Sequence, residues 1–165
     1  MRRHVLGRLV LMAMVPAAGD DLFPVHEAAA GGDMDRIRNL MVEGYNPFVP
    51  DEKGRTPVAL ARQSGRRDCA DFLASLRFKI YPSGNTYTGQ MRDGREEGWG
   101  VYRTVAGNLY AGEFRDGLFH GQGMWRYISG REYRGSFYKG LIAAENVASR
   151  DRYGDTVLFR EVRRG

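Results

Sequence analysis

A repeat of 23 residues, running from Tyr81 to about Glu145, constrains the fold of this 165-residue chain more than any other feature of its sequence. Each copy follows the pattern Gly-x-x-Tyr-x-Gly-x-Φ-x-x-Gly, in which Φ is Met or Phe. The copies begin at Gly84, Gly107 and Gly130. A constant period of this length is typical of an array of small structural units, and it argues against a chain folded around one central core.

The turn chemistry within each copy predicts β-hairpins. Asp93-Gly94, Asp116-Gly117 and Lys139-Gly140 each separate two segments in which apolar residues alternate with other residues. Asp-Gly is among the pairs that best tolerate the positive φ angles of a two-residue hairpin turn. Further Gly-centred turns open each copy. The sequence therefore predicts an antiparallel meander, with Phe78 to Tyr81 as the return strand of a truncated first copy.

Glycines recur inside the predicted strands, two residues after a tyrosine. Residues two apart on a strand point to the same face of the sheet. A glycine weakens a strand unless it makes room for something else. We therefore expect aromatic rings to lie across these glycines. The pairs are Tyr87/Gly89, Tyr110/Gly112 and Tyr133/Gly135.

This pattern resembles the MORN repeat (membrane occupation and recognition nexus), whose members form a long single-layer antiparallel meander. The resemblance covers about two full copies and a third that loses its second half. In that third copy, Ala144 and Asn146 stand where the pattern has glycine. The resemblance implies a fold and carries little information about function.

The segment before the meander has a period of its own. Pro24 and Pro57 open two similar stretches and lie 33 residues apart. The stretches resemble two ankyrin repeats, which implies pairs of helices. We expect one helix from Met34 to Glu43, ended by a glycine in the left-handed conformation at Gly44. Thr56 is expected to cap the helix that begins at Pro57.

The predicted fold class is α+β, with N-terminal ankyrin helical pairs packed against a single-layer antiparallel MORN meander. The expected segments are residues 1–21, an apolar and basic N-terminal segment; 22–76, two ankyrin repeats; 77–146, the MORN repeats; and 147–165, a tail. The last ankyrin helix is expected to reach Leu76, and no Pro-, Gly- or Ser-rich linker separates it from Ile80. We therefore expect a rigid joint between the helix and the first strand. The helices are the expected second layer over the aromatic face of the sheet.

Residues 1–21 allow three interpretations. Arg2, Arg3 and Arg8 precede an apolar run from Leu9 to Val15, and the first acidic residue is Asp20. The segment is either a retained docking helix, with Leu9 and Val10 as partner-binding candidates, or a targeting peptide, or a disordered tail.

Composition argues against several classes of function. The net charge of +5 is spread along the chain and forms no nucleic-acid-binding arm. The three histidines lack metal-ligand spacing, and Cys69 has no second cysteine. No phosphate-binding loop of the Gly-x-x-x-x-Gly-Lys type is present. We expect no catalytic residues, no metal, no cofactor and no nucleic-acid partner.

Several residues are candidates for contact with a protein partner. Trp99 is expected on the face of the sheet opposite the aromatic rings, where it either meets a partner or packs on the tail or the helices. Tyr45, Phe48 and Val49 lie in the predicted loop between the ankyrin repeats, where they either bind a partner or pack between the repeats. Leu141 and Ile142 would lie at the open end of the meander.

Arginines on the sheet suggest a second kind of surface. Arg92, Arg95, Arg103 and Arg115 are weak candidates for binding anionic lipid. Acidic residues are interleaved with them, which favours an ordinary solvated face. These residues are Asp93, Glu96, Glu97, Glu113, Asp116 and Glu132.

The sequence best fits a non-catalytic scaffold, adaptor or accessory subunit that binds other protein subunits of a larger assembly. The alternative is a peripheral membrane-tethering module that binds anionic lipid through residues 1–21 and the arginines. The expected location is intracellular, in cytoskeleton- or membrane-associated cytoplasm, or alternatively in a mitochondrion or another organelle.

Overall fold

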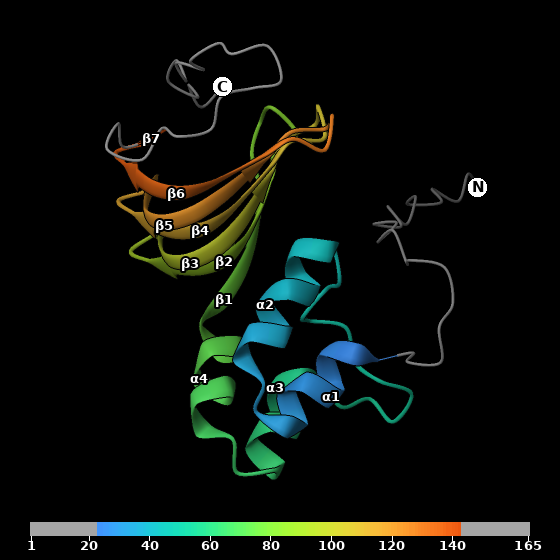
Figure 1. Ribbon diagram of the computed structural model, residues 1–165. Coiled ribbons are helices and arrows are strands. Elements are labelled where there is room, and N and C mark those ends of the chain that lie inside the picture. The colour runs from blue at the N-terminus through green and yellow to red at the C-terminus, as the bar shows by residue number, and fades with distance from the viewer. Residues whose placement is uncertain (1–22, 143–165) are drawn as a thin grey trace, which may run out of the picture. The chain divides into compact units, whose positions relative to one another are not determined.

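The computed structural model describes residues 23–142, and the predictions for Leu9, Val10 and the tail lie outside these residues. The described chain contains four helices followed by a seven-stranded antiparallel sheet (Figure 1). The predicted α+β class is therefore confirmed. The chain divides between Ala70 and Asp71 into two compact units, which are described separately below.

The first unit holds α1 (Pro24–Gly31), α2 (Met34–Glu43), α3 (Pro57–Gln63) and the first part of α4 (Arg67–Ser75). The predicted bounds of α2 are confirmed. The Asp33 side chain accepts a hydrogen bond from the backbone N–H of Arg36 at its start. Gly44 ends it with a φ of 111° and donates to the carbonyl of Leu40. Both ends follow ordinary capping chemistry.

The start of α3 also follows its sequence. Thr56 accepts a hydrogen bond from the backbone N–H of Ala59, and Pro57 occupies the first turn. The imidazole of His26, which is buried in α1, lies 2.9 Å from the carbonyl oxygen of Arg55. His26 thus connects α1 to the segment that leads into α3, which is a structural role.

Helix α4 ends one residue earlier than the sequence suggested. Leu76 was expected in the helix, but it is the first residue of β1 (Leu76–Ile80) and pairs with Gln90. Ser75 ends the helix, and its hydroxyl donates to the carbonyl of Phe72. The strand pairing therefore takes Leu76 out of the helix, and helix and strand follow each other without a linker.

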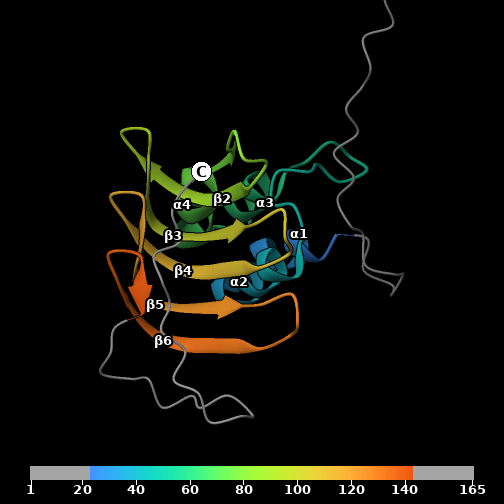
Figure 2. The same ribbon diagram turned by 90° about the horizontal axis from the view of Figure 1, so that it is seen from above.

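The seven strands pair in chain order, each antiparallel to its neighbours (Figure 2). The predicted meander is confirmed. β1 is the return strand of the truncated first copy, but it ends at Ile80 and does not include Tyr81 as predicted. The remaining strands are β2 (Thr86–Arg92), β3 (Arg95–Arg103), β4 (Leu109–Arg115), β5 (Leu118–Arg126), β6 (Glu132–Tyr138) and β7 (Leu141–Ile142).

The three two-residue turns have the geometry that their sequences predict. Asp93, Asp116 and Lys139 have φ angles of 49°, 50° and 49°, and each is followed by a glycine with positive φ. Two successive positive φ angles define a type I′ turn, whose twist matches that of the flanking strands. All three turns lie at one end of the sheet, on the left in Figure 2.

The strand glycines provide space for tyrosine rings, as expected. A Cβ added at Gly89 or Gly100 would lie within 2.5 Å of the Tyr87 side chain. Tyr110 lies over Gly112 and Gly123 in the same way: a Cβ added at these glycines would lie 2.7 and 2.5 Å from the Tyr110 hydroxyl. Each of these two tyrosine rings thus packs over a pair of glycines on two adjacent strands.

The rings on the aromatic face of the sheet pack against one another, and Tyr110 stacks on Phe119 with centroids 4.0 Å apart. On the other face, Phe72 of α4 contacts Trp99, with ring centroids 5.9 Å apart. Trp99 lies opposite the Tyr87 ring because side chains alternate along β3 and the next residue, Gly100, lies under that ring. The cluster is Tyr81, Tyr87, Tyr102, Tyr110, Phe114, Phe119, Trp125, Tyr133 and Phe137.

Candidate interaction surfaces

The loop between α2 and α3 presents two apolar side chains to solvent. Phe48 is 38% exposed and Val49 is 45% exposed, whereas Tyr45 is half-buried. The backbone N–H of Phe48 donates to the Asn46 side chain over 2.9 Å. We call Phe48 and Val49 the loop pair. A hydrogen-bonded loop that displays apolar side chains has the usual character of a binding loop.

Asp51 holds the second half of this loop. Its carboxylate accepts from the backbone N–H groups of Lys53 and Arg55, at 2.9 and 2.8 Å. The Arg55 guanidinium lies 2.7 Å from the same carboxylate. The loop pair therefore stands before a turn with a defined shape.

Trp99 is half-buried and lies on the face that was predicted for it. Its ring contacts Phe72, and its backbone N–H donates to the Gln90 side chain over 2.8 Å. This contact matches the packing interpretation of Trp99. At the far end of the sheet, Leu141 is 43% exposed, whereas Ile142 is half-buried against the aromatic cluster.

The four candidate lipid-binding arginines have different environments. Arg92 and Arg115 are exposed, and Arg95 forms an exposed 3.7 Å ion pair with Asp116. Arg103 is half-buried, and burial, together with the charge of Arg126, lowers its pKa. These arginines do not form one uniform basic stripe.

A hollow of about 390 Å³ lies beside the first of the two-residue turns. Positive and negative side chains line it in near balance, so it has no strong preference for an anion. The lining residues are Arg92, Asp93, Arg95, Glu97 and Asp116.

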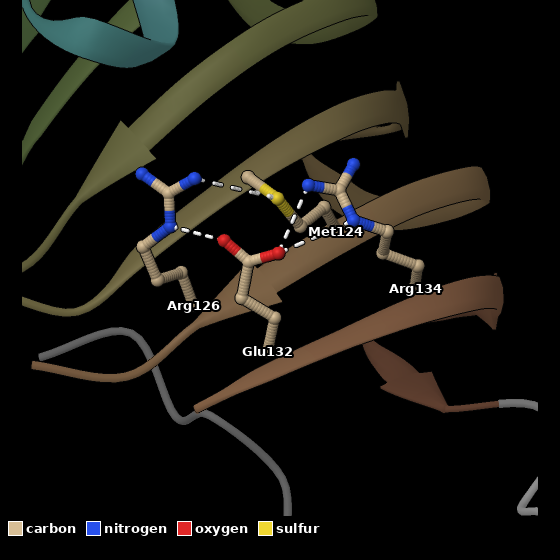
Figure 3. Close-up of polar contacts among 4 residues, drawn as sticks. All are labelled: Met124, Arg126, Glu132 and Arg134. Carbon is tan, nitrogen blue, oxygen red and sulfur yellow. Dashed lines mark hydrogen bonds and ion pairs between the residues drawn. The ribbon is translucent and has the colours of Figure 1, made fainter. Parts of the chain in front are cut away.

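Glu132 is clamped between two arginines (Figure 3). Arg126 Nε lies 2.5 Å from one carboxylate oxygen, and Arg134 Nη2 lies 2.9 Å from the other. The hydrogen bond from Arg126, and then that from Arg134, lowers the pKa of Glu132 below its ordinary value. The Met124 sulfur lies 4.0 Å from Arg126. The carboxylate neutralises charge on this face, as the interleaving predicted.

Glu96 differs from the other acidic residues of the sheet. The interleaving of charges predicts a solvated side chain, yet Glu96 is 1% exposed, so this prediction is wrong. Its carboxylate lies 2.8 Å from Lys79 Nζ and accepts a hydrogen bond from the Tyr81 hydroxyl. The repeat register contained the signal for this burial, because the residue 23 positions later is Phe119, a member of the aromatic cluster.

The described residues also bear on chemistry and on membranes. Cys69 is buried, and burial and then the charge of Asp68 raise the pKa of its thiol, which disfavours the reactive thiolate. Between residues 23 and 142, no group of three or more His, Cys, Asp or Glu side chains is placed to hold a metal ion. In the same range, no helix is long and apolar enough to cross a membrane.

No protein-family model matches the chain. Parts of several known proteins are similar to it, among them the following three. Espin-like protein from Homo sapiens is 38% identical over 74 residues, which cover 44% of this chain and 7% of that protein. The ARF GTPase-activating protein GIT1 from Homo sapiens is 37% identical over 57 residues, 34% of this chain and 8% of that protein.

The third is the ankyrin repeat domain-containing protein oryK from Aspergillus oryzae, which is 38% identical over 52 residues, 32% of this chain and 8% of that protein. The chain thus spans less than a tenth of the length of each of these relatives. The similarity concerns a segment of each relative.

Proposed function

We propose that this protein is a non-catalytic adaptor or accessory subunit, in which two ankyrin repeats and a short MORN sheet bind other protein subunits of a larger assembly. The 33-residue period with its capped helices supports the ankyrin assignment, as does the similarity to a protein named for ankyrin repeats. The tyrosine rings over paired glycines support the MORN assignment.

The loop pair is the observation that carries the proposal. Phe48 and Val49 remain exposed in a loop, between a hydrogen bond to Asn46 and the turn that Asp51 holds. Ordering a flexible loop on binding costs free energy, so a loop that is already shaped binds more tightly for the same contacts. An exposed aromatic side chain on such a loop is a suitable anchor for a protein partner.

The test compares partner recovery by loop and control variants. Quantitative affinity purification of the full chain is carried out with wild type, with Phe48→Asn combined with Val49→Ser, and with Val105→Ser. Val105 is 73% exposed and lies in a turn of the sheet, so it controls for a general loss of apolar surface. Stoichiometric partners that are lost with the loop variant and kept with the control support the proposal. Unchanged recovery with the loop variant contradicts it.

Anionic membranes are the competing ligand, because Arg92 and Arg115 are exposed. Flotation with phosphatidylserine vesicles separates the two functions. Binding that falls with added salt and with Arg92→Glu combined with Arg115→Glu favours tethering. A salt-resistant stoichiometric protein complex favours the adaptor.

A further inference from the structure

An apolar patch with a cationic border lies at one end of the sheet, on the face opposite the aromatic cluster. Its centre is Leu118, Tyr138 and Leu141, which are 39%, 57% and 43% exposed. We call these three residues the hairpin patch. Their neighbours Phe119 and Phe137 belong to the aromatic cluster, so alternation along the strands places Leu118 and Tyr138 on the other face.

The members of the patch adjoin one another across the last two hairpins. Tyr138 and Leu141 are register partners in β6 and β7. A Cβ added at Gly140 would lie 3.9 Å from Leu118, so Leu118 reaches toward the third turn. The backbone N–H of Gly140 donates to the carbonyl of Phe119 over 2.9 Å, which seats this turn against β5. The patch is therefore one continuous surface.

Positive charge borders the patch. Arg115 is exposed and is the register partner of Leu118. Lys139 Nζ lies 5.3 Å from the centroid of the Tyr138 ring. The carboxylate in the adjacent turn, on Asp116, is 3.7 Å from Arg95 and so faces another cation. The partner that complements this surface has apolar side chains flanked by carboxylates.

We propose that the hairpin patch is a second protein-docking site, which binds an acidic segment of a partner protein through an apolar anchor between carboxylates. Tyrosine and arginine are enriched at the centres of protein interfaces, and the patch combines them. This inference rests on the proposed adaptor function but uses a surface different from the loop pair.

The repeat register offers a matched control. Arg92 occupies the position in the first full copy that Arg115 occupies in the second, and both are exposed. In the first copy, however, the register partner of Arg92 is Arg95, where Arg115 has Leu118. Arg92→Glu therefore makes the same charge change in the same local geometry, away from the apolar side chains.

The experiment selects a random 12-residue peptide display library on the immobilised full chain. The enriched consensus is then synthesised, and its binding is measured by fluorescence anisotropy. We expect a consensus with an apolar residue between carboxylates. Arg115→Glu and Tyr138→Ser should each weaken binding by about tenfold, while Arg92→Glu and Phe48→Asn should change it less than about twofold.

Three results would overturn the docking site. These are a selection without such a consensus, peptide binding that Arg115→Glu and Tyr138→Ser leave unchanged, or peptide binding that is lost with Phe48→Asn alone. If phosphatidylserine vesicles bind the chain and Tyr138→Ser abolishes that binding while no peptide is enriched, the surface is a membrane site. The loop variant, whose hairpin patch is intact, tests the adaptor proposal separately through the loss of partners. Loss of partners with that variant would support the adaptor even where the peptide experiment fails, so the two failures are distinguishable.

Discussion

Two successive junctions between copies of the sheet repeat place different chemistry at the same positions. Tyr102, in the copy that begins at Gly84, and Phe119, in the copy that begins at Gly107, form an aromatic pair with centroids 5.7 Å apart. One repeat earlier, Lys79 of the truncated copy and Glu96 of the copy that begins at Gly84 occupy the corresponding positions and form an ion pair at 2.8 Å. The backbone pairing is the same at both junctions.

This difference separates what the fold requires from what it tolerates. The glycine pairs and the I′ turns set the strand register, because their backbone angles and absent side chains leave few alternatives. The cross-strand pairs fill the space that remains. An ion pair with one buried partner, Glu96, contributes little net stability, but removal of Lys79 or Glu96 costs free energy because the other charge loses its compensation.

Removal of the central ring should have the largest effect. Tyr110 is fully buried, and its ring contacts three phenylalanines of the cluster. Tyr110→Ala should lower the free energy of unfolding by about 3–5 kcal/mol. Tyr138→Ala, at a 57% exposed tyrosine, should lower it by less than about 0.5 kcal/mol. Urea denaturation measures both changes, and equal losses would refute the central role of Tyr110.

Adding a side chain at a glycine that lies under a tyrosine ring should have the second-largest effect on stability. A Cβ at Gly112 would lie 2.5 Å from the Cα of Gly123 on the neighbouring strand, and a backbone atom yields little. Gly112→Ala should therefore cost about 3 kcal/mol. Gly31 in α1 is the control, because a Cβ added there would meet no atom within 4 Å beyond its own helix backbone, and Gly31→Ala should raise stability by about 0.4–1 kcal/mol. If Gly112→Ala left the free energy of unfolding unchanged, the strand glycines would not be needed to make room for the tyrosine rings.

Conversion of the Lys79–Glu96 pair into the aromatic pair found one repeat later is the third test. Glu96→Phe alone removes the carboxylate that compensates the charge of Lys79 and accepts the hydrogen bond of Tyr81, and it should cost about 1–3 kcal/mol. Adding Lys79→Tyr recreates the chemistry of the Tyr102–Phe119 pair and should restore most of that loss. The coupling between the two substitutions is measured by a double-mutant cycle. Additive losses would show that the two pairs are not interchangeable.

The smallest effect concerns Glu132. Because the Arg126 and Arg134 hydrogen bonds lower its pKa, its stabilising contribution is present above its ordinary value of 4.5 and is lost as the pH falls through the lowered pKa. Glu132→Gln should therefore cost up to about 0.5 kcal/mol at pH 7, after allowance for solvent screening, and progressively less as the pH falls through the lowered pKa. Thermal unfolding over a series of pH values below 7 checks this, and a pH-independent difference would contradict it.

Much of the fold was predictable because it depends on local chemistry. The I′ turns, the caps of α2 and α3 and the strand glycines each follow from residues adjacent in the sequence. Contacts between distant residues were harder to predict. The partner of Glu96 lies 17 residues away, and only comparison with Phe119 indicates that position 96 is buried.

The candidate surfaces were predicted less completely than the fold. The exposed loop pair follows from apolar residues in a loop, and the side of Trp99 follows from alternation along its strand. The contact between Trp99 and Phe72 depends on how the end of α4 leads into β1, and the repeat period of the sequence does not indicate that geometry. Arg115 pairs with Leu118 across the second two-residue turn, but the hairpin patch also depends on strand order, because that order places Leu118 beside the third turn.

The native mass of the endogenous protein is the most direct test of the adaptor proposal. The chain is tagged, purified gently and analysed at low and high salt. The proposal predicts a particle much larger than the 18.6 kDa of the chain, with stoichiometric protein partners that persist at high salt. A free monomer at both salt concentrations would contradict it.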